Sequence, residues 1–203
     1  MEEVINNTSR KMISAMQVSL DGFVEDTDGK TEWVDSWADA IQFIDQVDMF
    51  LLGGRMYPSY GEYWRSIYAN PQCMPPSPEV PSQEGRVPSS SEIAYARLAA
   101  QTPHVVLSTT LKSVSWPKAQ IVRDIAELRA MKATPGKNTY VVGGAGLVAS
   151  LMDADLIDEL RLIVHPVVVG GGKQLFNGVR RHSLELIDAQ PSKSGRVILT
   201  YRT

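Results

Sequence analysis

Two apolar segments that each end in a pair of glycines constrain this chain more than any other feature. Residues 51–54 read Leu-Leu-Gly-Gly and residues 141–144 read Val-Val-Gly-Gly, and each pair precedes a segment of helical character. Short apolar runs that stop at glycine are typical of buried strands in a parallel sheet. Glycine lets a ligand approach the main chain closely, and the first N–H groups of a helix attract phosphate. A tight turn with close helix packing explains either pair alone, whereas both together favour a dinucleotide or a similar phosphate-bearing ligand at the strand ends.

The rest of the chain alternates short apolar runs with amphipathic segments. Strands that alternate with helices are typical of an α/β fold in which helices cover both faces of a mixed, mostly parallel sheet. The C-terminal part is rich in strands instead, which predicts antiparallel strands at one edge. Asp124, followed by Glu127, is a helix-capping pair. We expect strands at 11–18, 49–52, 105–107, 121–122, 140–142, 159–169, 184–189 and 196–201, and helices at 41–47, 92–100, 124–134 and 147–152.

The length of 203 residues suits one domain better than two. Six of the twelve prolines fall between residues 71 and 88, in a composition that no regular element tolerates. Because the alternation of strands and helices resumes beyond it, we interpret residues 70–90 as a proline-rich surface insertion within the domain. The polar, aperiodic residues 1–10 predict a flexible N-terminal tail. The expected organisation is a single domain over residues 11–203, preceded by that tail.

Charge and cysteine content argue against several classes of protein. With 20 basic and 23 acidic side chains and no block of like charge, the chain offers no groove for nucleic acid. The single cysteine, Cys73, allows neither an internal disulfide nor a cysteine zinc site, and the three histidines lack metal-ligand spacing. Glu2 and Glu3 stand where a secretory leader would be apolar, and no uncharged stretch is long enough to span a bilayer. We therefore expect a cytoplasmic protein with no metal site and no membrane or nucleic-acid partner.

Six short motifs each have little specificity alone, but their occurrence together in this order is specific. They are Ser-Leu-Asp-Gly at 19–22 with Trp33 beyond it, Gly-Gly-Arg at 53–55, Leu-Ser-Thr-Thr-Leu at 107–111, Val-Gly-Gly-Ala at 142–145, Leu-Ile-Asp-Glu-Leu at 156–160 and His-Pro-Val-Val-Val-Gly-Gly-Gly at 165–172. On these motifs the chain resembles the dihydrofolate-reductase-like superfamily, and in particular the bacterial proteins similar to the C-terminal reductase domain of the bifunctional riboflavin-biosynthesis deaminase/reductase. The resemblance implies a three-layer fold around a mixed sheet. It also implies an NAD(P)H-dependent reductase that transfers a hydride directly to a small heterocycle, such as a pterin or a riboflavin precursor.

The same resemblance implies a cofactor site at the glycine pairs. In the family the loop after the first strand closes over the nicotinamide, the first glycine pair meets the pyrophosphate, a Ser-Thr turn lies beside the adenosine phosphate, and the second glycine pair supports the pyrophosphate and nicotinamide side. The family often has a non-proline cis peptide bond between the second pair, which we expect at Gly143-Gly144. The residues carried over are Ala15, Gln17, Ser19, Leu20 and Gly22 for the nicotinamide, Gly54, Arg55 and Met56 for the pyrophosphate, Leu107, Ser108 and Thr109 for the adenosine phosphate, and Gly143, Gly144, Ala145, Gly146 and Leu147 for the second glycine turn.

Two positions depart from the family pattern. Met56 stands where the family commonly has threonine, which removes a hydroxyl donor to phosphate. Thr109 stands where it commonly has arginine, so that a cation for a 2′-phosphate has to come from Arg123 or Lys112. NADPH is the cofactor that the resemblance implies, with NADH as the alternative. The departures leave open a second hypothesis, a non-catalytic nucleotide-binding or interaction module on the same fold.

Seven of the eleven Trp and Tyr residues lie between positions 33 and 68. Aromatic walls suit a flat heterocycle, and packing between helices is the alternative role for the same side chains. Dihydrofolate reductases orient their substrate with a carboxylate on the first helix, and Asp39 is nearest to that position, with Asp35 as the second choice and a solvated helix-face acid as the alternative. The predicted substrate contacts are Trp33, Trp37, Tyr57 and Tyr60.

The apolar residues 165–169 and the C-terminal strands predict pairing through a sheet edge. The resembled family is often dimeric, and we expect a homodimer. His165 itself is expected to have a structural role.

Overall fold

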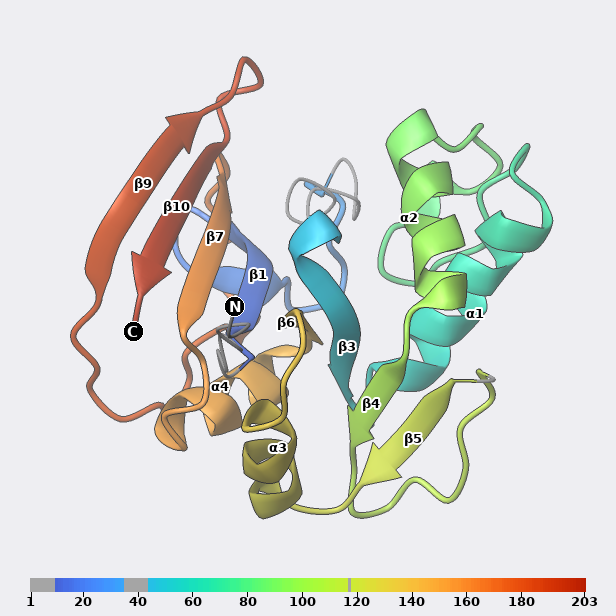
Figure 1. The fold of residues 1–203 in the computed structure, drawn as a ribbon. Coiled ribbons are helices and arrows are strands. Elements are labelled where there is room, and N and C mark those ends of the chain that lie inside the picture. Colours follow the sequence, from blue (N-terminus) through green and yellow to red (C-terminus); the bar gives the residue numbers. More distant parts are fainter. Residues whose placement is uncertain (1–9, 35–43, 117) are drawn as a thin grey trace, which may run out of the picture.

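An eight-stranded sheet forms the centre of the computed structural model, which describes residues 10–34, 44–116 and 118–203 (Figure 1). Neighbouring strands are parallel from β5 to β7, and the last two strands are antiparallel. The predicted mixed sheet with antiparallel C-terminal strands is therefore confirmed. In spatial order the strands are β5 (Ala119–Val122), β4 (His104–Leu107), β3 (Val47–Gly53), β6 (Asn138–Gly143), β1 (Met12–Ser19), β7 (Glu159–His165), β10 (Val197–Arg202) and β9 (Glu185–Pro191).

Helices cover both faces of the sheet, as predicted. Successive residues of a strand point to opposite faces, so Ile13 and Ala15 of β1 join one core cluster while Met12 and Met16 join the other. None of the helices in the described part of the chain is both long and apolar enough to cross a membrane. The helices are α1 (Tyr57–Ala69) and α2 (Ser90–Gln101) on the first face, and α3 (Ile125–Lys132) and α4 (Ala145–Asp153) on the second.

The helix starts follow local sequence signals. Ser89 and Glu92 form a complete capping box at α2. At α3 the Asp124 side chain accepts a hydrogen bond from the Glu127 N–H, as predicted, but the Glu127 carboxylate accepts from the N–H of Arg123 (2.7 Å), one residue further out. The predicted capping pair is therefore used in a slightly extended form.

Three elements differ from the prediction. The strand expected over 159–169 ends at His165, because Pro166 has no N–H to donate and Val167 instead accepts from the N–H of Leu20 (2.8 Å). Of the helix expected over 41–47, residues 41–43 lie outside the described residues, 44–46 form one 3-10 turn and Val47 begins β3. A two-stranded ribbon of β2 (Phe23–Glu25) and β8 (Lys173–Gln174) was not predicted.

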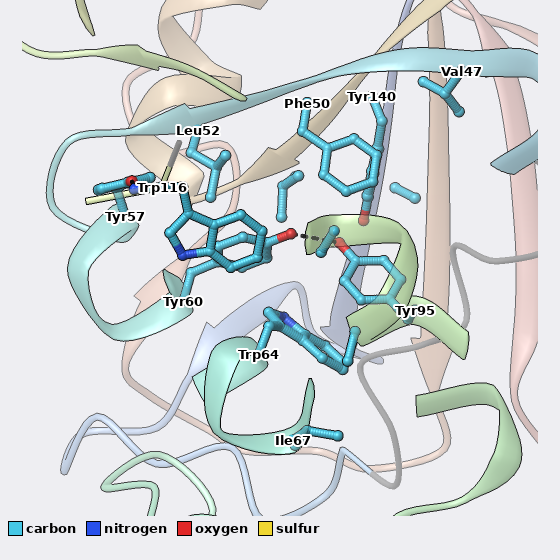
Figure 2. Close-up of a cluster of buried hydrophobic side chains, with 14 of the residues drawn as sticks. Val47, Phe50, Leu52, Tyr57, Tyr60, Trp64, Ile67, Tyr95, Trp116 and Tyr140 are labelled. Atoms are coloured by element: carbon cyan, nitrogen blue, oxygen red, sulfur yellow. Dashed lines mark hydrogen bonds between the residues drawn. The ribbon is translucent and has the colours of Figure 1, made fainter. Parts of the chain in front are cut away.

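An aromatic core fills the space between α1, α2 and the sheet (Figure 2). The hydroxyls of Tyr60 and Tyr95 share a hydrogen bond of 3.1 Å, and the Phe50 ring packs against Tyr95. His104 lies edge-on to Phe50 and Trp116, and burial lowers its pKa to about 4. This half of the molecule is therefore held by specific contacts between side chains.

The proline-rich segment connects α1 to α2. It contains one 3-10 turn, Pro81–Gln83, and is otherwise irregular. Although most of its residues are exposed, Met74 and Val80 are fully buried. The segment is thus anchored to the domain by apolar side chains, which its polar composition did not predict.

Candidate functional site

The two glycine pairs lie side by side at the carboxyl ends of β3 and β6. Leu52 is in register with Gly143, and a Cβ atom on Gly53 would lie 3.9 Å from the carbonyl oxygen of Gly143. The peptide bond between Gly143 and Gly144 is cis, which confirms the expectation. The ends of two neighbouring parallel strands therefore form one glycine-lined edge.

The start of α4 is open to a ligand. Gly144 is the N-cap and provides no side-chain cap, so the first N–H groups of the helix are available. A Cβ atom on Gly144 or on Gly146 would meet no other atom within 4 Å, and Gly146 is exposed. Ala145 and Leu147 are buried and hold the helix against the sheet. The combination of free N–H groups, helix dipole and empty space suits a phosphate.

The start of α1 lies against the β4 end of this edge. The N–H of Gly54 donates to the carbonyl of Leu107 (3.0 Å), and a Cβ atom on Gly54 would overlap the side chain of Ser108, so only glycine fits there. Arg55 is exposed and makes no hydrogen bond or ion pair within the described residues. Met56 is half-buried, with its sulfur 3.4 Å from the position of a Cβ on Gly143. Arg55 can therefore reach a ligand, while Met56 packs beneath the second glycine pair.

The turn after β4 is held by polar contacts. The hydroxyl of Ser108 accepts hydrogen bonds from the N–H groups of Thr110 (3.3 Å) and Leu111 (3.0 Å). The Arg123 guanidinium donates from Nη1 to the carbonyls of Ser108 (2.7 Å) and Leu111 (2.8 Å). Thr109 and Lys112 are exposed beside this turn. Positive charge therefore lies at this end of the edge, although the Ser108 hydroxyl is already used within the turn.

The loop after β1 is joined to the loop after β7. Asp21 accepts hydrogen bonds from the N–H groups of Gly170 (2.8 Å) and Val169 (3.1 Å). The Ser19 hydroxyl and these two N–H groups lower the pKa of Asp21 to about 2. Gly22 has a φ of 88°, which suits glycine at this tight turn. Leu20 projects from the loop with 66% of its surface exposed. No sequence pattern indicated that Asp21 would connect the two loops.

Two polar side chains meet at the ends of β1 and β7. Nε2 of His165 lies 2.7 Å from Oε1 of Gln17, so that the histidine N–H donates to the amide oxygen. His165 is buried, Gln17 is half-buried, and Ala15 lies two residues earlier on the same face of β1. Gln17 is therefore fixed by a residue that was not among the predicted site residues.

A groove of about 520 Å³ runs between the first turn of α4 and the β2–β8 ribbon. Its polar wall includes Lys173, whose ammonium group pairs with Glu25 (2.7 Å), and its other wall includes Gly146. The ribbon that the sequence did not predict thus faces the first turn of α4 across this groove. Other residues of the groove are Phe23, Ala145, Ala149, Gly171, Gly172, Gln174, Leu175 and Asn177.

The residues predicted on the substrate side are only partly brought together. Tyr57 and Tyr60 are buried in the aromatic core, and the Tyr57 hydroxyl accepts from the N–H groups of Ser115 and Trp116 (3.1 Å each). Their burial gives them a packing role, which is the alternative stated above for these aromatic side chains. Trp33 is half-buried. Trp37, Asp35 and Asp39 lie outside the described residues. No group of three or more His, Cys, Asp or Glu within the described ranges could hold a metal ion.

Solved structures with the same architecture include a candidate riboflavin biosynthesis protein of Shewanella (TM-score 0.65, 22% identity, 95% of this chain and 98% of that one). They also include an Enterococcus faecalis dihydrofolate reductase in complex with NADP(H) (TM-score 0.59, 13% identity, 95% of each chain). A third is a Thermotoga maritima diaminohydroxyphosphoribosylaminopyrimidine deaminase/5-amino-6-(5-phosphoribosylamino)uracil reductase (TM-score 0.60, 14% identity), of which the match spans 56%. These likenesses confirm the predicted three-layer fold.

Two sequence relatives match most of the chain, and a family model matches nearly all of it. The uncharacterized proteins YyaP and YwjB of Bacillus subtilis are 29% identical over 201 residues and 28% identical over 173 residues. The first alignment covers 97% of this chain and 96% of YyaP, and the second covers 83% of each. The family model described as the RibD C-terminal domain matches residues 10–200, nearly the whole described chain. The chain with the glycine-lined edge is therefore a member of the RibD C-terminal domain family, which has a reductase-type fold.

Proposed function

We propose that the protein is an NAD(P)H-dependent reductase of a small heterocyclic substrate, of the pterin or riboflavin-precursor type. The observation that carries the proposal is the open glycine edge, where Gly144 and Gly146 leave space beside the first N–H groups of α4. The residues fit a dinucleotide, because this edge also has an exposed arginine, Arg55, within the adjacent turn. Bound dihydronicotinamide would supply the hydride.

The chain's own residues would bind and orient the two reactants. In this proposal the N–H groups of residues 144–146 and the Arg55 guanidinium hold the pyrophosphate. Arg123 and Lys112 provide the positive charge for an adenosine 2′-phosphate, which favours NADPH over NADH. Ala15, Gln17 and Leu20 border the nicotinamide, and the joined loops after β1 and β7 exclude water from that end.

The proton for the reduction remains a separate proposal. Asp39 is the first candidate and Asp35 the second, as residues that orient the heterocycle and hold the proton. Trp33 and Trp37 are the proposed aromatic contacts. Removing the acid with Asp39→Asn should lower the rate of reduction and leave NADPH binding unchanged, and the same outcome for Asp35→Asn alone would reassign the role.

Thermal unfolding tests the cofactor. At about 100 times its dissociation constant, NADPH should raise the Tm by about 5–10 °C, because ligand at that excess adds about 2.7 kcal/mol to the free energy of unfolding. AMP and inorganic phosphate should give much smaller shifts. Equal shifts with all three ligands would contradict the proposal.

A second candidate function is a nucleotide-binding module without catalysis. It is favoured by Met56, which packs beneath the glycine pair in place of a hydroxyl donor, and by Ser108, whose hydroxyl is used within its own turn. Single-turnover oxidation of NADPH in the presence of pterins and ribosylaminopyrimidines separates the two. Binding without oxidation across that panel would favour the module.

The proposed assembly is a homodimer in the cytoplasm. All seven residues of β9 are exposed, and its outer edge has no partner strand in the described chain. Leu186 and Ile187 of β9 are 53% and 44% exposed, which is unusual for apolar residues of a sheet. Light scattering at micromolar concentration should give twice the mass of one chain, and Leu186→Lys should give a single chain.

A further inference from the structure

The proline-rich insertion holds the segment Thr31–Val34 at successive points. The carbonyl of Glu79 accepts hydrogen bonds from the N–H (2.7 Å) and the hydroxyl (3.2 Å) of Thr31. The hydroxyl of Ser82 donates to the Glu32 carboxylate. Thr31 and Val34 are 2% and 1% exposed, although both belong to a connection without regular structure. A buried, hydrogen-bonded connection has a defined conformation, and this one is defined by residues almost fifty positions further along the chain.

Gln83 makes the last of these contacts and uses both ends of its amide. Its Nε2 donates to the Val34 carbonyl (2.6 Å), and its Oε1 accepts from the Arg86 guanidinium (2.9 Å). Arg86 in turn forms two hydrogen bonds with the carboxylate of Glu92, at 2.6 and 2.9 Å. Glu92 is 1% exposed and belongs to the capping box of α2. A continuous polar chain therefore runs from the first turn of α2 through Arg86 and Gln83 to the backbone of Val34.

The segment held in this way carries Trp33, which is half-buried. The glycine edge, by contrast, makes no hydrogen bond or ion pair with residues 79–86 in the part of the chain that the structure describes. The insertion is thus connected to the substrate side and not to the cofactor edge. A change in the insertion should therefore affect binding of the heterocycle more than binding of the dinucleotide.

We propose that Gln83 is a positioning residue for substrate binding, which transmits the fixed geometry of α2 to the segment that presents Trp33. The proposal rests on the proposed function, since Trp33 is a substrate contact there. It gives the proline-rich insertion a role: a support for the substrate side, specific to the heterocycle and independent of the dinucleotide.

Two substitutions separate this role from general support of the fold. Gln83→Glu keeps an acceptor for Arg86 but loses the donor to the Val34 carbonyl, whereas Gln83→Leu loses both contacts. Gln72→Leu is the matched control, because Gln72 is exposed in the same insertion and its side chain makes no hydrogen bond within the described residues.

Hydrogen–deuterium exchange and ligand binding are measured on all three variants. Both Gln83 variants should speed exchange of the Thr31 and Val34 amides by about fivefold, as expected for one hydrogen bond. They should raise by about the same factor the KM of the pterin or ribosylaminopyrimidine that wild type reduces. The NADPH Kd should change by less than about twofold, and Gln72→Leu should match wild type. Unchanged exchange, a wild-type KM in Gln83→Glu, or equal losses of NADPH and substrate affinity would overturn the proposal. The proposed function would be overturned if wild type bound NADPH no better than AMP. Hydrogen–deuterium exchange needs no ligand, so even then it tests whether Gln83 holds Val34.

Discussion

The glycine-lined edge and the aromatic half of this molecule are built in opposite ways. The edge is made of main chain: two glycine turns, the first N–H groups of α4 and carbonyls that fix Arg123. The aromatic half is made of side chains, namely the aromatic core beneath α1 and the polar chain from Glu92 to Val34. Backbone geometry repeats wherever the same short motif occurs, whereas side-chain networks are particular to one sequence. This difference explains why short motifs predicted the glycine-lined edge, whereas the side-chain networks were not predicted.

The largest expected effect is a dependence of stability on pH that comes from the aromatic half of the molecule. His104 is fully buried with a pKa lowered to about 4, so between pH 6.5 and 4 the unfolded chain binds a proton that the folded chain does not. The free energy of unfolding should therefore fall as the pH decreases through that window, by about 3 kcal/mol from this group alone. Urea unfolding at pH 7 and pH 4.5 measures the fall. His104→Gln should reduce the pH dependence, and an unchanged dependence in that variant would assign it to other groups.

A methyl group at the first glycine turn should have the next largest effect. Gly54→Ala places a Cβ into the side chain of Ser108, and relief of that overlap should cost about 1–3 kcal/mol of stability. Gly146→Ala is the matched control, because its Cβ would meet nothing within 4 Å. Chemical denaturation should separate the two variants clearly. Equal stabilities would mean that the turn is not fixed by this contact.

A charge at the second glycine turn should affect binding without affecting the fold. Gly146→Glu adds a carboxylate to the first turn of α4, where it is favourable for the helix and repels phosphate. We expect the Kd for NADPH to rise about tenfold while the Tm stays equal or increases slightly. Isothermal titration of wild type, Gly146→Ala and Gly146→Glu tests this. Unaltered affinity in the glutamate variant would place the pyrophosphate elsewhere.

The smallest expected effect concerns the loop after β1, which Asp21 joins to the loop after β7. Asp21→Asn leaves one acceptor oxygen for two N–H groups, so the Val169 and Gly170 amides should exchange faster and the NADPH Kd should rise about two- to threefold. In wild type the Asp21 carboxylate has a pKa of about 2 against an ordinary value of 3.8. Its contribution to the stability of the folded state is therefore complete above pH 3.8 and is lost as the pH falls towards 2. Exchange that is faster at neutral pH in the variant alone would support this, and identical rates would contradict it.

Much of the fold followed from local patterns. The strand–helix alternation and the cap at Asp124 were predicted because each depends on residues close in sequence. The cis bond between Gly143 and Gly144 was expected from the family resemblance. The β2–β8 ribbon was missed because its strands are very short and partly polar, and because its two halves are far apart in the chain. Pro166 ended β7 earlier than the apolar run suggested, since an apolar composition does not compensate for a missing N–H.

In the candidate site, too, the features that were not predicted are contacts between side chains. Tyr57 and Tyr60 stand three residues apart on one face of α1, and spacing alone cannot distinguish a face that lines a cleft from one that meets the sheet. The polar composition of residues 71–88 gave no sign that Val80 would be buried or that Gln83 would hold Val34, because both depend on contacts formed only after folding. The contacts of Asp21 and His165 were likewise not predicted, because their partners lie almost 150 positions away in the chain.

The contacts of Arg123 have a consequence for any attempt to redesign the proposed cofactor preference. One nitrogen of its guanidinium closes the turn after β4 by bonding two carbonyls, so replacing this arginine would loosen the turn that carries Ser108 and Thr109. Lys112, exposed beside the same turn, makes no hydrogen bond or ion pair with any described residue. A library that seeks NADH preference should therefore vary position 112 and keep position 123 constant.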